Sequence, residues 1–297
     1  MYKLLVKYNN FISTGLKILF SFTAVFFLWQ QKYFRLFFAG GYPSVGFYFG
    51  FWLILFSIVN WFFEIKKWQS LVEPVQKIHF YDAFRQSLTA FSLSLLSPNR
   101  VGEFGVKPLF FEKKKAKKIF SLSVLGAFTQ MSVSLFFGII SLVYLYYSGN
   151  LPQMTHLDIS FVLPVIFLFV VVLLFVYFKR KFHFDFDVWK KSLHYSFLRY
   201  AVFSTQFVLL LHFFLPEISF RLLYQLVLLT YFFATLIPAF SFLDWAVKGS
   251  VAVWIAGLFE IHSPIIIKVV GLMWILNFFI PFLIGWWLIL QHKSVLK

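Results

Sequence analysis

Long apolar segments, each about as long as a bilayer is thick, constrain this chain more than any other feature. A helix needs about 20 mostly apolar residues to cross the roughly 30 Å hydrocarbon core of a membrane. Seven segments approach or exceed this length, at about 11–30, 46–63, 119–147, 161–178, 193–215, 221–239 and 265–291. Two shorter apolar runs lie at about 83–97 and 249–262. We therefore expect an all-α, polytopic helical membrane protein with about 6–8 spans, built as a single integral-membrane domain over residues 1–297.

The strong positive charge of the chain fits basic loops better than a nucleic-acid surface. Lys+Arg 27 outnumber Asp+Glu 11, which gives a formal net charge of +16. In a soluble protein this balance indicates nucleic acid, but 61% hydrophobic residues with only 13% charged residues indicate a membrane protein. The chain contains no cysteine, which excludes disulfides and Cys-ligated metals, and its histidines are scattered. We expect no nucleic-acid partner, no metal and no cofactor.

Lysine and arginine gather in loops that should share one side of the membrane. Residues 113–118 and 179–191 hold five basic residues each, whereas 148–160 holds none. Because basic residues accumulate in short cytoplasmic loops, the first two segments are predicted inside and the third outside. The same rule places the stretch 64–85 and both termini inside. We predict a multi-pass protein of the bacterial inner membrane with a cytoplasmic N-terminus and C-terminus.

An apolar run between two cytoplasmic segments should enter the membrane and return on the same side. Residues 83–112 lie in this position, and their turn is predicted at 97–103, Ser-Pro-Asn-Arg-Val-Gly-Glu. Non-helical backbone at membrane depth survives only where it is buried in protein or lines a wet cavity. We therefore predict a re-entrant hairpin whose turn is a candidate site. The segment from Ile65 to Phe84 is predicted as an amphipathic interfacial helix.

Two short strings in the chain share one pattern. Residues 103–107 read Glu-Phe-Gly-Val-Lys, and residues 244–248 read Asp-Trp-Ala-Val-Lys. Each string follows a proline, Pro98 or Pro238. The agreement in residue type at all five positions indicates a repeated element.

The second string interrupts the apolar stretch 221–262, which enters from the outer side. This stretch is either a re-entrant loop or two crossings that meet at a cytoplasmic turn. One interrupted hairpin from each side is typical of an inverted repeat, and such breaks mark midplane binding sites. We predict repeat halves at about 1–147 and 161–297.

The residue types at these breaks suit an anionic ligand. Glu103 and Lys107, like Asp244 and Lys248, lie four apart and so share a helical face. A charge at the bilayer centre costs about 2.5–3.5 kcal/mol, so these groups need pairing or solvation. Arg100 can hold a phosphate at two points. The alternative for each acid–lysine pair is a salt bridge that closes the turn and never meets a substrate.

Further candidates lie beside the first break and in a later span. Gly102 and Gly105 should let backbone pass closely, and free N–H groups at the start of a broken helix favour anions. Arg199 and Gln206 lie seven apart on one face; Arg199 either faces the bundle interior or reaches back to the cytoplasmic interface. We assign no catalytic residue. The candidate substrate-binding residues are Asn99, Arg100, Gly102, Glu103, Gly105, Lys107, Arg199, Gln206, Asp244 and Lys248.

Several of these motifs together resemble a known family. The turn at 97–103, followed by a span with Thr129 and Gln130, resembles the transmembrane region of bacterial lysylphosphatidylglycerol synthases. The segments 198–207 and 237–250 look like later signatures of that family. Its relatives include stand-alone flippase-like membrane proteins, so the resemblance implies a helical membrane fold and lipid transport.

The chain departs from the family pattern in two ways. Asp244, Ala246 and Lys248 stand where the family usually has Glu, Gly and Arg, so two-point phosphate binding is not implied there. The sequence also contains no large soluble aminoacyl-transfer domain after its last apolar segment. We therefore expect the flippase part alone, without lysylphosphatidylglycerol synthesis.

Taken together, these features favour a lipid flippase or transporter that handles an anionic or aminoacylated phospholipid headgroup in a midplane cavity. One alternative is an integral-membrane transferase acting on a lipid-linked substrate, with Glu103 or Asp244 as general base. Another is a non-catalytic membrane assembly subunit. Expected partners are phospholipid and the bilayer itself, together with either a second copy in a homodimer or a lipid-synthesis enzyme.

Overall fold

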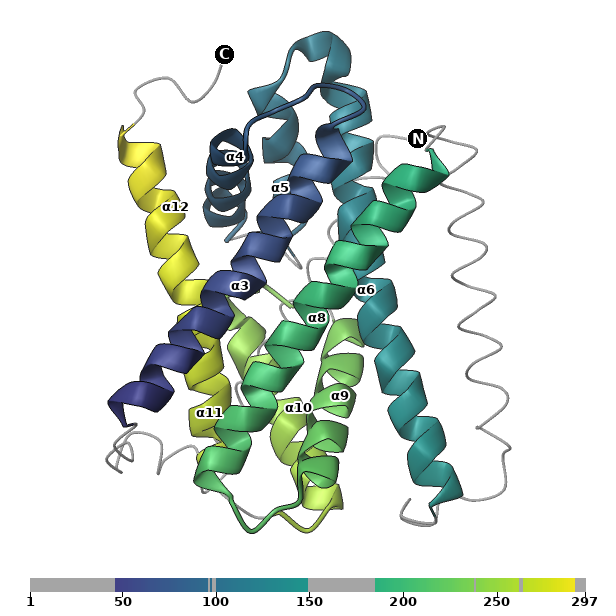
Figure 1. The fold of residues 1–297 in the computed structure, drawn as a ribbon, viewed down its shortest axis with the longest axis vertical. Helices are drawn as coiled ribbons and strands as arrows, with labels where there is room; N and C mark the ends of the chain where they lie inside the picture. Colours follow the sequence, from purple (N-terminus) through teal and green to yellow (C-terminus); the bar gives the residue numbers. More distant parts are fainter. Residues whose placement is uncertain are drawn as a thin grey trace, which may run out of the picture.

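The computed structural model describes residues 46–148, 185–261 and 264–291, apart from positions 96, 98, 99 and 238. Throughout this part of the chain the regular elements are helices (Figure 1). Four of them are long and apolar enough to cross a membrane, which confirms the predicted all-α membrane protein. They are α3 (Phe47–Val72), α6 (Lys113–Tyr147), α8 (Phe186–Phe214) and the continuous segment Ile265–Gln291. The predicted spans 11–30 and 161–178 lie outside the described residues.

Helix α3 continues well past the end predicted for its span at residue 63. It ends at Val72, and a turn and an extended segment lead from there to the next helix. The prediction of one interfacial helix from Ile65 to Phe84 is therefore wrong. The physical reason is packing: Ile65 and Trp68 are 3% and 1% exposed, in a core shared with α6 and α8.

The first re-entrant hairpin is formed by α4 (Phe80–Leu93), α5 (Gly102–Val106) and a short 3-10 helix, η1 (Lys107–Phe110). Helix α4 starts at the end of the bundle where α3 ends and α6 begins, and it runs to the middle (Figure 1). The chain then returns through α5 and η1 to the same end. We call this the lysine-rich end, because α6 begins there with the lysines of 113–118. The hairpin predicted over 83–112 is present.

The second hairpin enters from the opposite end. It consists of α9 (Phe220–Leu236), a 3-10 turn η2 (Ser241–Leu243) and α10 (Asp244–Leu258). Helix α9 reaches only the middle of the bundle, and α10 returns to the end from which α9 came (Figure 1). Of the two topologies that the sequence allows for 221–262, the structure has the re-entrant one.

The two hairpins sit in matching places between long helices. The order of α3, first hairpin and α6 is repeated by α8, second hairpin and the last span. Helices α3 and α8 lie side by side and run in opposite directions (Figure 1). This is the order of elements that an inverted repeat requires. The repeat halves at 1–147 and 161–297 remain a prediction.

The last span is broken in the middle by a π-helical turn. Helix α11 (Ile265–Trp274) leads into this turn, η3 (Ile275–Phe279), and α12 (Ile280–Gln291) follows. Pro281 lacks the N–H that would bond to the carbonyl of Asn277 in a regular helix. That carbonyl instead accepts a hydrogen bond from Trp61 Nε1 at 3.1 Å, which ties the break to α3.

Glycines let both hairpins pack tightly against full-length helices. A Cβ at Gly138 of α6 would lie 2.3 Å from the Cβ of Phe232 on α9. A Cβ at Gly285 of α12 would lie 2.2 Å from the carbonyl oxygen of Leu88 on α4. Small residues at such contacts are typical of membrane helices, whose association depends on close packing.

Candidate functional site

The tips of the two re-entrant hairpins touch. Ser241 Oγ donates a hydrogen bond to the carbonyl oxygen of Ser97 at 2.9 Å, and the Ser241 N–H reaches the same oxygen at 3.4 Å. The backbone N–H of Arg100 donates to Ser241 Oγ at 3.1 Å. Each break in the helices thus satisfies backbone groups of the other, as backbone at membrane depth must be satisfied.

A cavity of about 420 Å³ opens beside these tips. Its walls come from both hairpins and from α3, α6, α8 and the last span. Over the described part of the chain, five cations and three acids line it, a net charge of +2. They are Lys67, Arg100, Lys107, Arg199 and Lys248, with Glu64, Glu103 and Asp244.

The first group of charges, which we call the Glu103 cluster, consists of Arg100, Glu103 and Lys107. Glu103 Oε1 accepts hydrogen bonds from the Arg100 guanidinium, and Lys107 Nζ lies 3.2 Å from Glu103 Oε2. Aromatic rings complete the cluster, because Lys107 Nζ lies 4.4 Å from the Trp68 ring centroid and the Arg100 guanidinium 4.5 Å from that of Phe91. The predicted Glu103–Lys107 pair is present, with Arg100 as a third member and cation–π contacts at both cations.

Arg100 has a backbone conformation that favours glycine. Its φ is 59°, in the left-handed region, where a residue with a side chain carries a strain of about 1–3 kcal/mol. The conformation persists because both ends of the residue are held. The N–H bonds to Ser241 and the guanidinium bonds to Glu103.

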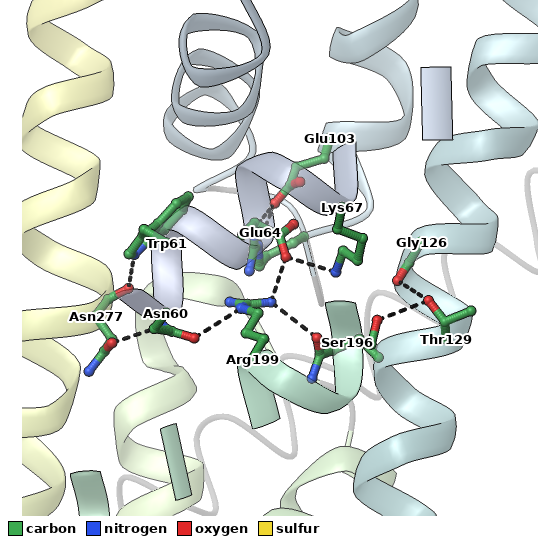
Figure 2. A network of polar contacts seen from close by, with 12 residues as sticks. Asn60, Trp61, Glu64, Lys67, Glu103, Gly126, Thr129, Ser196, Arg199 and Asn277 are labelled. Carbon is green, nitrogen blue, oxygen red and sulfur yellow. Dashed lines mark hydrogen bonds and ion pairs between the residues drawn. The ribbon is translucent and has the colours of Figure 1, made fainter. Parts of the chain in front are cut away.

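The second group, the Glu64 cluster, consists of Glu64, Lys67 and Arg199 (Figure 2). Glu64 Oε2 lies 2.7 Å from Lys67 Nζ and 2.8 Å from Arg199 Nη1. Arg199 also donates from Nε to Asn60 Oδ1 at 3.2 Å and from Nη1 to Gln130 Oε1 at 3.4 Å. Of the two predictions for Arg199, the structure supports the bundle interior and contradicts the interface.

Glu64 and Lys67 were not among the predicted site residues. The charge pattern predicts a cytoplasmic stretch for both, whereas their side chains are 7% and 5% exposed inside the bundle. Asn60, Glu64 and Lys67 follow one another at four and three residues, so they form a polar stripe on one face of an apolar helix. That spacing was the available signal.

A chain of amide side chains links the Glu64 cluster to the last span (Figure 2). Asn60 Nδ2 donates to Asn277 Oδ1 at 2.9 Å, and Asn277 Nδ2 donates to Gln206 Oε1 at 2.9 Å. Gln206 then donates from Nε2 to the Leu53 carbonyl and to Ser57 Oγ, both at 2.8 Å. Gln206 is fully buried and is not among the residues that line the cavity, so its contacts join helices.

The third pair of charges comes from the second hairpin. Lys248 Nζ lies 2.5 Å from Asp244 Oδ2, as the i, i+4 spacing predicted. Lys248 Nζ is also 5.5 Å from the ring centroid of Tyr231. Both charged side chains line the same cavity as the two clusters.

The other candidates at the first break are Gly102, Gly105 and Asn99. A Cβ at Gly102 would lie 2.9 Å from Ser97 Oγ, so close passage is real there. At Gly105 a Cβ would meet nothing within 4 Å, so the predicted close approach of backbone is wrong there. The Gly102 N–H is not free for an anion, because it donates to Ser97 Oγ at 2.9 Å. Asn99 lies outside the described residues.

The chemistry available in the cavity is ionic recognition. Arginine and lysine donors surround carboxylates that do not balance them, next to aromatic and apolar walls. Such a site can hold a phosphate or carboxylate group together with adjoining apolar matter. Within the described residues, no three metal-ligating side chains gather at one point.

No family model, curated protein or solved structure matches this chain.

Proposed function

We propose that this protein moves phospholipid across the bilayer, as a lipid flippase or transporter. The observation that carries the proposal is the position and charge of the cavity. It lies where two re-entrant hairpins from opposite ends meet, and among the described residues its lining has two more cations than acids. A binding site at the junction of inverted broken helices is the arrangement found in alternating-access transporters. The resemblance to the transmembrane region of lysylphosphatidylglycerol synthases points in the same direction.

In this proposal the cations hold an anionic headgroup and the acids limit the repulsion among them. Arg100 and Lys107 approach it from the first hairpin, Lys248 from the second, and Arg199 from α8. Glu103 and Asp244 balance these charges or contact a cationic part of an aminoacylated headgroup. Rocking of one half against the other exposes the cavity to each side in turn. The lysine-rich end faces the cytoplasm of a bacterial inner membrane, whose anionic leaflet attracts lysine.

A transferase mechanism has less support from the same contacts. Glu103 would serve as general base only with an oxygen available to a substrate proton. Its Oε1 accepts from Arg100, and its Oε2 faces Lys107 at 3.2 Å. Asp244 is held by Lys248 at 2.5 Å. These carboxylates are placed to pair with cations.

A transport assay on reconstituted protein tests the proposal. Proteoliposomes with fluorescent phospholipid in both leaflets are treated with an impermeant quencher, and the protected fraction reports movement between leaflets. We expect Arg100→Gln and Glu103→Gln to abolish movement. The matched control is Glu112→Gln, because Glu112 also contacts two lysines but is 59% exposed and does not line the cavity. Helical content and monodisperse elution establish that each variant is folded. Full activity in both cavity variants would refute the proposal.

A further inference from the structure

We infer that the headgroup bound in this cavity carries two negative charges on phosphate, as a phosphate monoester or a diphosphate does. The inference rests on the proposed function and narrows it from anionic phospholipid to one class. A phosphodiester headgroup such as that of phosphatidylglycerol carries a single negative charge and is the class that it disfavours.

The net charge of +2 in the cavity is divided between the two clusters, each of which has one more cation than acids. In the Glu103 cluster one carboxylate is shared by Arg100 and Lys107, and in the Glu64 cluster one carboxylate is shared by two other cations. Each cluster therefore has a net charge of +1. The Asp244–Lys248 pair is neutral, so the +2 of the lining resides in the two clusters.

The two clusters are close enough to interact electrostatically, so a single ligand can contact both. Arg100 of the first and Arg199 of the second are close enough to repel each other, and each is also attracted by the carboxylate of the other cluster, Glu64 or Glu103. All four residues line the same cavity. A single group with two negative charges can therefore neutralise both excesses, whereas a group with one charge leaves one of them unbalanced in an environment that penalises charge.

Among the residues that the structure describes, one guanidinium nitrogen in each cluster is also left without a partner. Arg100 contacts Glu103 through Nε and Nη2, and Arg199 binds its partners through Nε and Nη1. Within the described residues, Arg100 Nη1 and Arg199 Nη2 have no hydrogen-bond partner. A phosphate monoester presents three terminal oxygens, which is enough to accept from both arginines and still face a lysine. A diester presents two.

Ligand-induced stabilisation of the purified full-length protein tests this inference. Thermal unfolding in detergent is measured at pH 7 with phosphatidic acid, phosphatidylglycerol or phosphatidylcholine of identical acyl chains, and separately with inorganic phosphate. We expect phosphatidic acid to bind at least about tenfold more tightly than phosphatidylglycerol, a difference equivalent to about 1.4 kcal/mol. Phosphatidylcholine should have no effect, because its headgroup has no net charge.

Two substitutions remove one excess charge each, so that either remains informative if the other fails to fold. Lys67→Gln leaves Glu64 paired with Arg199 at 2.8 Å, and Lys107→Gln leaves Glu103 paired with Arg100. Both should reduce the preference for phosphatidic acid over phosphatidylglycerol to about threefold or less. The matched control is Lys66→Gln, because Lys66 adjoins Lys67 in α3 but does not line the cavity. It should keep the full preference.

The outcomes separate this inference from the proposed function. Equal binding of the two anionic lipids, with leaflet exchange intact, overturns the inference and leaves lipid transport in place. Preferential binding of phosphatidic acid without movement of any phospholipid supports the inference and contradicts transport. Stabilisation by inorganic phosphate, with none by either lipid, keeps the dianionic class but overturns the lipid as its source.

Discussion

Glu64→Gln should destabilise the protein more than the loss of either cation that Glu64 holds. The carboxylate is shared by Lys67 at 2.7 Å and Arg199 at 2.8 Å. The three side chains are 7%, 5% and 16% exposed, so water screens none of them well. An amide at this position has the same shape but leaves two buried cations facing each other.

The structure sets the expected sizes of these effects. Removing the one acid of a buried ion cluster should lower the free energy of unfolding by about 3–5 kcal/mol. Arg199→Gln leaves the Glu64–Lys67 pair intact at 2.7 Å, so it loses only hydrogen bonds to charged groups, about 1.5–3 kcal/mol. The double variant Glu64→Gln/Arg199→Gln should lose less free energy of unfolding than the two single variants added together, because it leaves one buried cation instead of two.

Unfolding of the purified protein in mixed detergent micelles measures these free energies. Glu112→Gln is the matched control, since Glu112 lies 2.8 Å from Lys114 and 3.8 Å from Lys115 but is 59% exposed. The hydrogen bond from Lys114 lowers the pKa of Glu112, and this interaction is exposed to water. This control should leave stability unchanged. The reasoning is refuted if Arg199→Gln costs as much as Glu64→Gln, or if the control costs as much as either.

Three further predictions concern packing and the hairpin tips. Gly138→Ala should lower the free energy of unfolding by about 1–3 kcal/mol, because its Cβ would lie 2.3 Å from that of Phe232. The control Gly257→Ala should leave it unchanged, because a Cβ there would meet nothing within 4 Å. Equal effects would contradict the close approach of α6 and α9. Ser241→Ala should lower stability by about 1–3 kcal/mol in the same measurement, since it leaves polar groups unpaired at the junction of the hairpins, and an unchanged value would argue against that junction. Arg100→Gly should be more stable than Arg100→Ala by about 1–2 kcal/mol because of the φ of 59°, although both should lose transport; the opposite order would contradict the left-handed backbone.

Hydropathy and charge were sufficient to predict the first hairpin, but they left two topologies open for 221–262 and did not identify the full set of cavity charges. A short apolar run between lysine-rich segments has few alternatives, so the first hairpin follows from the sequence. The turn predicted at 97–103 is placed too late, because α4 ends at Leu93 and α5 already begins at Gly102. The repeated acid–lysine spacing similarly predicts Glu103 with Lys107 and Asp244 with Lys248, because partners four apart in a helix are local. These pairs are present at 3.2 Å and 2.5 Å.

The partners that lie far apart in the sequence were not predictable in this way. Glu64 and Arg199 are separated by 135 positions, and only the side-by-side packing of α3 and α8 brings them together (Figure 1). The rule that lysines lie in loops placed Lys67 outside the membrane, although packing of the surrounding apolar side chains extends α3 past it. Asn277 is uncharged, so the charge pattern could not predict its hydrogen bond to Gln206. Its carbonyl can accept from Trp61 because Pro281 has no N–H to bond to it.

The contact between the hairpin tips has a consequence for how the protein is made. Ser97 and Ser241 are 144 positions apart, so the first hairpin leaves the ribosome long before its partner exists. Until then the Ser97 carbonyl and the Arg100 N–H lack the hydroxyl that satisfies them, at a depth where the bilayer offers no substitute. The first hairpin should therefore stay near the membrane surface, or under the protection of the insertion machinery, until the second arrives. Completion of the cavity would then be the last step of assembly, and a chain cut before Ser241 should be degraded.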